Sequence, residues 1–318
     1  MTKATFDTDI KEQDGVLISP FRHPIQMLAE QEYGGHLSIH DDDQAEKLGF
    51  SGAPIEGPTH FSQFDPLLHK IWGDRWFENG CISSHFKTMV IEGDEVQVFA
   101  EIPSEDSHIT KIWAHKKTGE MVLEGTASLG PEHPETHLDK LMASRPTPEQ
   151  LVLLEGIKIG DKSPSTDIVT MGRDQHLGDS YPFTLASKLE KITERCRWYD
   201  ESPDSPFGGA IIPTEMISPL VGYTKSGLRG PKGPSIGLFA DLEVRLIKGP
   251  LLVGKEYALE REVVGLGESK RTESMWIKTY IRDPESQELL ATTLLNSATM
   301  KQSYEKYDEE AARLGKVL

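Results

Sequence analysis

Residues 50–61 read FSGAPIEGPTHF, and residues 207–216 read FGGAIIPTEM. Both stretches begin with phenylalanine, a small residue, glycine and alanine, and both reach Pro-Thr followed by a titratable residue, His60 or Glu215. The first copy has one extra residue before its proline. A motif that returns far along one chain is typical of a duplicated unit. The sequence therefore predicts one fold used twice, in keeping with a length of 318 residues, which exceeds the roughly 100–200 residues of an average domain.

Helices are predicted after both prolines. The stretch that follows Pro58, THFSQFDPLLHKIW, has apolar residues at spacings of three and four, which is the pattern of a helix with one buried face. The stretch after Pro213, TEMISPLVGY, is apolar nearly all round, as expected of a buried helix. Proline is common at the first helical position, whereas Pro66 and Pro219 inside these stretches predict a bend or a short helix.

Strand-like segments follow each helix. They span 80–91, 94–102, 109–116 and 120–129 in the first copy, and 236–247, 252–265, 273–282 and 288–300 in the second. Turn-forming residues separate most of them, so each copy should be a helix followed by about four antiparallel strands. Polar, proline-marked residues 131–150 predict a linker with a short helix. Residues 151–161 and 166–171 are candidate opening strands of the second unit, and 301–318 predict a helical surface tail.

Charge and composition exclude several classes of protein. Lys and Arg total 34 against 51 Asp and Glu, which gives a formal net charge of −17. This acidic balance argues against non-specific binding of nucleic acid and against docking on anionic lipid. No apolar run approaches the roughly 18 residues that span a bilayer, and the first residues lack a basic-then-apolar export signal. The two cysteines make neither a disulfide framework nor a zinc site. We therefore expect a cytoplasmic protein without a nucleic-acid or membrane partner.

The segment AEKLGFSGAPIEGPTH, residues 45–60, resembles the central segment of MaoC-like enoyl-CoA hydratases. In that family the pattern is roughly Gly-Asp-x-Asn-Pro-x-His, then Ala-x-x-x-Gly-Phe, then small-x-Ile-x-His-Gly-Met at the helix start. The matching residues are Ala45, Gly49, Phe50, Ile55 and Gly57, and His40 falls close to the family's catalytic histidine. The resemblance covers Tyr33–Phe61 well and is confined in the second half to FGGAIIPTEM and the strand pattern.

This resemblance implies a fold of the α+β class, a fused double hotdog. Two central helices, each wrapped by an antiparallel sheet, would form within one chain the pseudo-dimer that single hotdogs build from two chains. We expect an N-terminal hotdog unit over residues 1–140 and a C-terminal unit with a tail over residues 141–318.

The chain departs from the family pattern at several motif positions. Gly35 stands where the family spacing places the catalytic aspartate, and Glu56 stands where a histidine precedes the glycine. In the second half, the stretch Asp200-Glu201-Ser202-Pro203 resembles the Asp-x-Asn-Pro start, with Ser205 at the histidine position. Neither half carries the complete Asp–His pair, so the acid and the base are sought among other titratable residues.

Hydration of an α,β-unsaturated thioester needs a base for water, an acid for the α-carbon and donors for the enolate oxygen. His40 is the lead proton-transfer residue because the free pKa of histidine lies near neutral, and an aspartate from residues 41–42 is expected to orient it. Glu56 is its predicted partner, since burial raises the pKa of a carboxyl group. His60 and Glu215, at equivalent repeat positions, are further candidates.

Donors for the enolate oxygen are expected from the helix start, whose free N–H groups and dipole favour negative charge. The candidates are the N–H groups of Gly57, Thr59 and His60. Every titratable candidate also has a structural interpretation. His40 could belong to a capped helix start, Glu56 could bind backbone N–H groups, and the remaining two could be ordinary first-turn residues.

Residues 225–237, KSGLRGPKGPSIG, form an unusually basic loop in an acidic chain. Lys225, Arg229 and Lys232 lie among glycines in a pattern that is neither a Walker loop nor a dinucleotide-binding turn. We expect this loop to bind the phosphates of coenzyme A, with a mobile surface loop as the alternative. A histidine pair within residues 36–40 could suggest a metal, but no fourth ligand is spaced for it, so we expect no metal site.

The sequence as a whole predicts a hydratase or dehydratase that acts on an α,β-unsaturated or 3-hydroxy acyl thioester, with acyl-CoA as the substrate and no separate cofactor. Two alternatives stay open. A hotdog thioesterase would use a carboxylate such as Glu56 or Glu215 to activate water against the thioester carbonyl. A non-catalytic relative would bind an acyl ligand or pair with an active partner. A homodimer is also left open.

Overall fold

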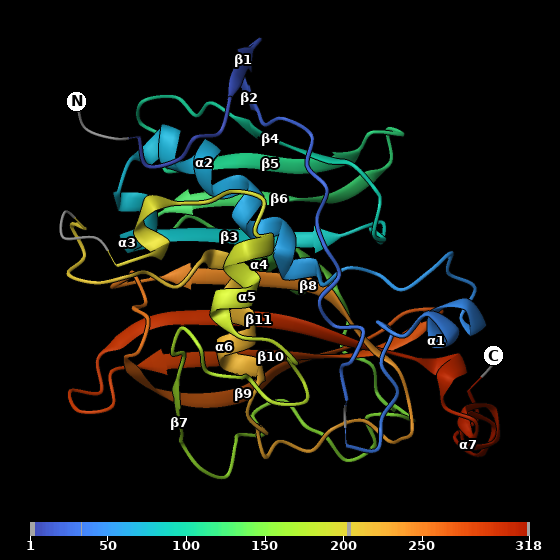
Figure 1. Ribbon diagram of the computed structural model, residues 1–318. Helices are drawn as coiled ribbons and strands as arrows, with labels where there is room; N and C mark the ends of the chain where they lie inside the picture. The colour runs from blue at the N-terminus through green and yellow to red at the C-terminus, as the bar shows by residue number, and fades with distance from the viewer. Residues whose placement is uncertain (1–3, 33, 202–204, 317–318) are drawn as a thin grey trace.

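In the part of the chain that the structure describes, eleven strands form one continuous antiparallel sheet, whose course can be followed in Figure 1. The strands of the first half are β1 (Lys11–Gln13), β2 (Val16–Ile18), β3 (Gly80–Phe86), β4 (Val96–Glu101), β5 (Ile109–Lys116) and β6 (Met121–Leu129). Those of the second half are β7 (Asp167–Thr170), β8 (Gly237–Leu246), β9 (Glu256–Glu268), β10 (Thr272–Arg282) and β11 (Leu289–Met300). Their order across the sheet is β1-β2-β4-β5-β6-β3-β8-β11-β10-β9-β7.

The computed structural model describes residues 4–32, 34–201 and 205–316. Tyr33, Ser202 and Pro203, on which part of the sequence interpretation rests, lie outside the described residues. The α-helices are α1 (Asp42–Lys47), α2 (Phe61–Trp72), α3 (Arg75–Asn79), α4 (His137–Ser144), α5 (Leu185–Lys191), α6 (Ile217–Gly222) and α7 (Tyr307–Arg313). Short 3-10 turns are η1 (Gly57–His60), η2 (Arg197–Tyr199), η3 (Thr214–Met216) and η4 (Lys301–Ser303).

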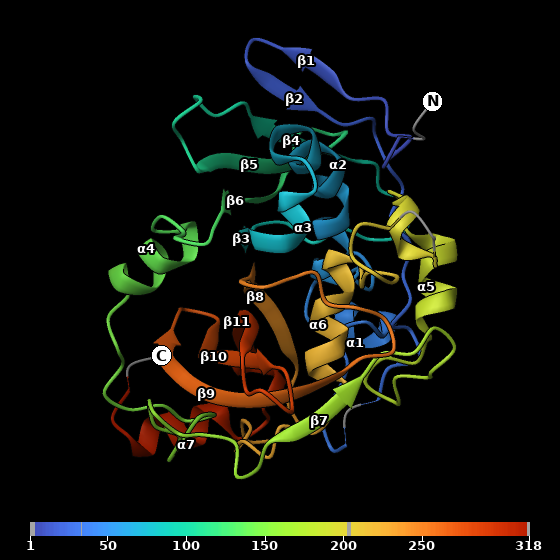
Figure 2. The ribbon, with the colours of Figure 1, turned by 90° about the vertical axis from the view of Figure 1, so that its left-hand side faces the viewer.

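The two halves meet at a seam between β3 and β8, where Cys81 pairs with Arg245 and His85 pairs with Asp241. Each half carries one central helix, α2 or α6, on the same side of the sheet, as Figure 2 shows. A sheet that wraps two such helices within one chain is a double hotdog, so the predicted fold class is confirmed. Both helices follow a short 3-10 turn, which begins one residue before Pro58 in the first copy and one residue after Pro213 in the second.

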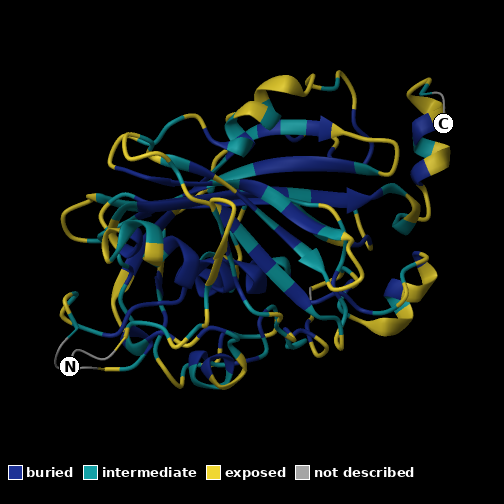
Figure 3. Ribbon diagram, turned by 90° about the horizontal axis from the view of Figure 1, so that it is seen from above, coloured by how far each residue is buried: buried dark blue, intermediate teal, exposed yellow. Residues whose placement is uncertain are grey.

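Burial of one helix face explains why α2 forms where the sequence pattern predicts it. Phe61, Phe64, Leu67 and Leu68 recur at spacings of three and four, and all are fully buried. Burying a side chain of this size contributes roughly 1.5–3 kcal/mol. The helix continues through Pro66, whereas α6 is only 6 residues long. The central helix and the middle strands are accordingly buried, while the helix beside the C-terminus carries exposed residues on its outer side (Figure 3).

The predicted linker helix is α4, which lies on the side of the sheet opposite to α2 and α6 (Figure 2). Thr136 and Asp139 close its start in a capping box. Leu138 is fully buried in a cluster with Trp276 and Leu294, and its N–H donates to a serine of β3. The helix therefore covers the seam from its outer face. The expected unit boundary at residues 140/141 falls inside α4, and the division into units stays a prediction.

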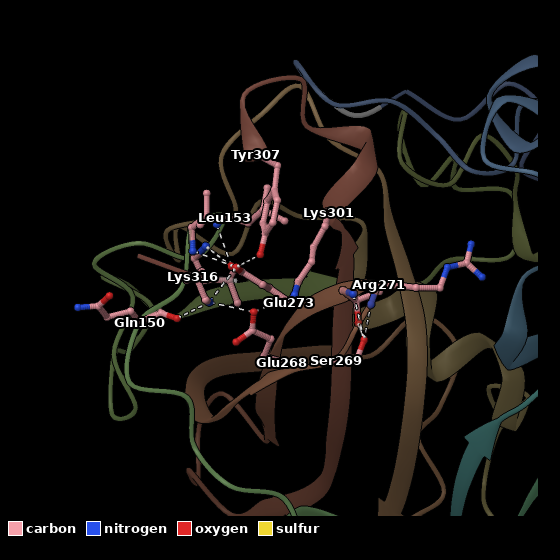
Figure 4. A network of polar contacts seen from close by, with 12 residues as sticks. Gln150, Leu153, Glu268, Ser269, Arg271, Glu273, Lys301, Tyr307 and Lys316 are labelled. Atoms are coloured by element: carbon pink, nitrogen blue, oxygen red, sulfur yellow. Dashed lines mark hydrogen bonds and ion pairs between the residues drawn. The ribbon is translucent and has the colours of Figure 1, made fainter. Parts of the chain in front are cut away.

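Residues 151–161 do not form the strand expected of them, whereas the strand expected within residues 166–171 is present as β7. The N–H groups of residues 152–154 donate instead to the carboxylate of Glu273 on β10, at 2.9, 2.8 and 3.3 Å. The hydroxyl of Tyr307 also donates to Glu273, and Lys316 lies 3.9 Å away, as Figure 4 shows. The buried carboxylate thus replaces a neighbouring strand as acceptor and anchors the C-terminal segment.

None of the helices in the described ranges is long and apolar enough to cross a membrane.

Candidate active site

A cavity of about 410 Å³ opens beside η1. Four of the predicted site residues line it: His40, Glu56, Gly57 and His60. Further lining comes from the first half, from the ends of β8 and β11, and from Tyr181 of the second half. The candidates from the loop before α1 and from the helix start are therefore brought together, although 16 positions separate His40 from Glu56 (56 − 40).

His40 is held by a single backbone group. Its Nδ1 lies 2.7 Å from the carbonyl oxygen of Pro54. A carbonyl oxygen only accepts, so Nδ1 carries the proton and Nε2 keeps its lone pair. Burial lowers the pKa of His40 to about 4, despite an opposing effect of this hydrogen bond. The imidazole is therefore neutral at pH 7 and suited to act as a base.

Asp41 and Asp42, one of which was expected to orient His40, instead accept hydrogen bonds from backbone N–H groups, so that prediction is wrong. Asp41 caps α1 by accepting the N–H of Gln44, and Asp42 accepts the N–H of Ala53. Both side chains are engaged by backbone donors because the helix start and the following loop leave these N–H groups free. The capped helix start proposed as the structural interpretation of this segment is present, beside a histidine that also lines the cavity.

Glu56 is a buried residue that stands immediately before the first residue of η1. It is 5% exposed, and its Oε1 has no hydrogen-bond partner among the described residues. Burial raises the pKa of Glu56 to about 7, against the ammonium of Lys188, which lowers it, and with a smaller upward effect of Glu215. A group with such a pKa gains and loses a proton close to neutral pH, as an acid–base catalyst requires.

The helix start offers fewer free donors than the sequence predicts. The N–H of Thr59 donates to the carbonyl of Glu56 at 3.1 Å, so it is not available to a ligand. Gly57 stands at the first position of the turn and lines the cavity. A Cβ at Gly57 would lie 2.9 Å from Cζ of Phe86, so a larger residue here would have to displace the Phe86 ring. Gly57 stays a predicted oxyanion donor in the cavity wall.

His60 is almost fully buried at the end of η1. Its Nδ1 lies 3.2 Å from Oε1 of Gln63. Burial lowers the pKa of His60 to about 4, and the nearby ammonium groups of Lys188 and Lys116 act in the same direction. His60 is thus a second neutral imidazole on the cavity wall, one turn beyond Glu56.

Glu215, the equivalent of His60 in the second copy, does not line the cavity. It is 1% exposed, and burial raises its pKa. Its Oε1 lies 3.2 Å from Nζ of Lys188. The two helix starts are therefore unequal: one faces the cavity and the other is enclosed by protein.

No protein-family model and no curated protein matches the sequence. Solved structures do match. A MaoC domain protein from Chloroflexus aurantiacus J-10-fl, a candidate dehydratase, is 16% identical, with a TM-score of 0.54 over 84% of this chain and 88% of its own. This chain has a double-hotdog fold, similar to the fold of that MaoC domain protein.

Two further matches are more distant. The dehydratase domain of PpsC from Mycobacterium tuberculosis, in complex with C12:1-CoA, is 8% identical, with a TM-score of 0.46 over 92% of this chain and 97% of its own. A conserved double-hotdog protein from the same organism is 10% identical, with a TM-score of 0.44 over 82% and 86% of the two chains.

Lys188 is a site residue of the double hotdog that the sequence interpretation missed. It projects from α5, is 3% exposed, and donates a hydrogen bond of 3.0 Å to Oγ1 of Thr59. One sequence signal could have found it. Lys188 stands three residues after Leu185 and one before Leu189, on the apolar stripe of a helix whose start is marked by Thr184. A lysine on such a stripe is buried only with partners.

Asp65 was also missed. It is fully buried in α2 and accepts hydrogen bonds from Trp76 Nε1 at 2.8 Å, Tyr199 hydroxyl at 3.1 Å and Thr214 Oγ1 at 2.9 Å. Burial raises the pKa of Asp65 to about 7, although these three hydrogen bonds lower it. Because two of the donors come from the second half, Asp65 ties α2 to η2 and η3.

The basic side chains of the loop at residues 225–237 do not line the cavity. Nζ of Lys232 lies 2.6 Å from a carboxylate oxygen of Glu155 and 2.6 Å from one of Glu310. Lys225 and Arg229 are exposed and, like Lys232, are not among the cavity-lining residues. Binding of coenzyme A phosphates by these residues stays a prediction.

The histidine pair in residues 36–40 is split between two partners. His36 Nδ1 lies 3.2 Å from Oγ of Ser235, whereas His40 contacts Pro54. Among the described residues no group of three or more His, Cys, Asp or Glu side chains could hold a metal ion.

Proposed function

We propose that this double hotdog is a hydratase or dehydratase of α,β-unsaturated or 3-hydroxy acyl thioesters, with acyl-CoA as the substrate. One observation carries the proposal: a buried carboxyl group with a pKa of about 7 and a neutral imidazole with a pKa of about 4 line one cavity. When the environments of two titratable groups move their pKa values apart in this way, the difference indicates which group is the acid and which is the base. The carboxyl group is Glu56 and the imidazole is His40.

In the dehydration direction, Nε2 of His40 removes the proton on the α-carbon of a 3-hydroxyacyl thioester. The electron pair moves to the thioester carbonyl, whose oxygen becomes negative and accepts a hydrogen bond from the N–H of Gly57 at the helix start. Glu56 gives its proton to the β-hydroxyl group, which leaves as water while the α,β double bond forms. Hydration runs through the same steps in reverse, with Glu56 as the base for water and protonated His40 as the acid.

The cavity wall suits an acyl chain. Leu28, Ile39, Met89 and Phe239 are among the apolar side chains that line it. A cavity of about 410 Å³ falls within the range typical of small-molecule sites. Its mixture of an apolar wall and a few polar groups supports a ligand with a carbonyl beside a hydrocarbon chain.

The test is incubation of the protein with crotonyl-CoA and, separately, with saturated acyl-CoA thioesters. We expect loss of the enoyl absorbance without release of free thiol, and no reaction of the saturated thioesters. Release of free thiol from either substrate would instead support the thioesterase alternative. Silence with both, over a series of chain lengths, contradicts both enzymatic proposals and favours the non-catalytic relative.

The remaining expectations stay proposals. They are the absence of a separate cofactor, a cytoplasmic location and a homodimer; size measurement in solution tests the last.

A further inference from the structure

A buried ammonium group bridges the two helix starts of the double hotdog. Nζ of Lys188 lies 3.2 Å from Oε1 of Glu215 and 3.9 Å from Oε2 of Glu56. Its hydrogen bond to Thr59 fixes it beside η1. All three charged residues are at most 5% exposed. Two carboxylates and one ammonium group thus share one site that water does not screen.

Charge balance decides how this cluster holds protons. With both carboxylates ionised, the cluster has a net charge of +1 − 2 = −1, which a buried site tolerates poorly. One added proton makes it neutral. The ammonium group of Lys188 is closer to Glu215 than to Glu56, at 3.2 against 3.9 Å. The proton therefore belongs on Glu56, the carboxyl group that lies farther from the ammonium group.

The other titratable groups near the cluster are neutral or are engaged by partners of their own. His60 is neutral because burial lowers its pKa to about 4. Burial raises the pKa of Asp65 to about 7, and its oxygens are already engaged by three donors. Lys116 on β5 pairs with Asp94 at 2.8 Å. Lys188 is accordingly the cation that governs Glu56.

We propose that Lys188 is a positioning residue for the reaction at Glu56: by pairing with Glu215, it leaves Glu56 as the protonated carboxyl group at the cavity. The inference rests on the proposed function, because it explains how Glu56 holds the proton that dehydration needs. Neither Lys188 nor Glu215 lines the cavity, so both act through Glu56.

The position of Lys188 makes the second half a component of the first half's site. The N–H of Glu32 donates to the carbonyl of Asp179 at 2.9 Å, which ties the segment before α5 to the loop that leads to His40. Tyr181 of the same segment lines the cavity. Nζ of Lys188 lies 5.6 Å from the ring centre of Phe183. The chain between residues 179 and 188 therefore supplies part of the cavity wall, through Tyr181, and a charge beside Glu56, through Lys188.

The test uses the full chain and three variants: Glu215→Gln, Lys188→Met and, as the matched control, Lys191→Met. Lys191 belongs to the same helix and is exposed. The readout is the titration of Glu56 by NMR of protein labelled with carbon-13 at the glutamate carboxyl carbon, with the Glu56 signal assigned through Glu56→Gln. This readout needs no turnover.

The two cluster variants are expected to move Glu56 in opposite directions. Glu215→Gln removes a repelling charge and leaves Lys188 to Glu56 alone, so the titration midpoint of Glu56 falls by about 1–3 pH units. Lys188→Met removes the attracting cation, so the midpoint rises, and Lys191→Met leaves it unchanged. If Lys188→Met does not fold, Glu215→Gln still decides. A Glu56 midpoint in Glu215→Gln within about half a unit of the wild type overturns the inference.

Failure of this inference is distinguishable from failure of the proposed function. If the chain is not a hydratase, the wild type shows no turnover, whereas the Glu56 signal still shifts in the variants. If Lys188 and Glu215 serve only packing, turnover is present and the Glu56 signal does not shift. If both proposals hold, the alkaline limb of the dehydratase pH profile moves with the Glu56 midpoint in Glu215→Gln, down by the same about 1–3 units.

Discussion

η1 and η3 are two copies of one short turn, and their surroundings differ. Glu56, Gly57 and His60 at the first turn line the cavity. Thr214, Glu215 and Met216 at the second are 6, 1 and 0% exposed and lie outside the cavity wall. A duplicated turn can therefore keep its backbone geometry in both copies, while only one of the two copies faces a cavity that a ligand can enter.

Local contacts explain the difference. Both copies hold the backbone before the turn by one equivalent hydrogen bond, from the N–H of Ile55 to Val90 and from the N–H of Ile212 to Leu251. In the second copy the N–H of Ile211 also donates to the carbonyl of Trp198, whereas Pro54 in the first copy has no N–H to donate. The first copy has one more residue at this point, and Gly57 leaves room for the ring of Phe86. The extra residue places a carboxyl group on the cavity wall, where the second copy packs isoleucine.

The largest effect is expected from the two glutamates. Glu56→Gln removes the acid and should lower turnover by about 10²–10⁴-fold at every pH, the usual range for one acid–base group. Glu215→Gln, measured at its own optimum pH, should lower turnover by less than about tenfold, because Glu215 touches no ligand. Steady-state rates across pH distinguish the two. Equal losses would mean that both helix starts take part in the chemistry.

The next largest effect is expected on stability, from Asp65, which joins the two halves through buried hydrogen bonds. Asp65→Ala strands three buried donors and should lower the free energy of unfolding by about 3 kcal/mol. Asp65→Asn keeps one acceptor oxygen and should cost less. Urea denaturation measures both. A loss below about 1 kcal/mol for Asp65→Ala would show that the halves do not depend on this residue.

Dehydration should have a bell-shaped pH profile. His40 works as the neutral base, so activity falls as pH drops through its pKa of about 4. Glu56 works as the protonated acid, so activity also falls as pH rises through its pKa of about 7. Outside these limits kcat/KM should change about tenfold per pH unit. A profile that keeps rising from pH 7 to 9 contradicts the assignment of Glu56 as the acid.

A methyl group at the first helix start should disturb the site without unfolding it. Gly57→Ala places a Cβ 2.9 Å from Phe86 and should lower kcat/KM by about tenfold through the displaced oxyanion donor. Gly57→Ala combined with Phe86→Leu should recover part of this loss. Gly52→Ala is the control, since its Cβ would meet no heavy atom closer than 3.7 Å.

The smallest effect concerns the basic loop. If Lys225 and Arg229 bind phosphates of coenzyme A, replacing both with alanine should raise KM for an acyl-CoA by about fivefold, as expected of exposed charges. KM for the matching acyl-pantetheine, which lacks these phosphates, should not change. Equal KM values for the wild type and the double variant with acyl-CoA would identify the loop as surface only.

Much of the fold could be predicted because it repeats. The turn at Pro58 and its counterpart at Pro213 mark both central helices, and strand patterns such as 109–116 coincide with the observed strand. Residues 151–161 were misread because their apolar side chains fit a strand, whereas their N–H partners belong to Glu273, more than a hundred positions away. A local pattern does not show an acceptor so distant in sequence.

The site could be predicted only where it is local. His40, Glu56 and Gly57 stand in or near one motif and line one cavity. Lys188 and Asp65 were missed because their importance comes from partners in the other half, Glu56 and Thr59 for Lys188 and Thr214 for Asp65. Burial of a charge is a property of tertiary packing, and a helix period alone does not tell a buried lysine from one at the edge of an apolar face.

The seam between β3 and β8 makes the molecule a natural split protein. α4 ends at Ser144 over that seam, and the following Pro146 and Thr147 are exposed. A protease that cleaves the chain there would leave two fragments that stay joined by the hydrogen bonds between β3 and β8. Asp65 of one fragment would still accept a hydrogen bond from Thr214 of the other. The peptide link between the two halves would then serve mainly to keep them in a one-to-one ratio. Two fragments that are produced separately should therefore complement each other when they are mixed.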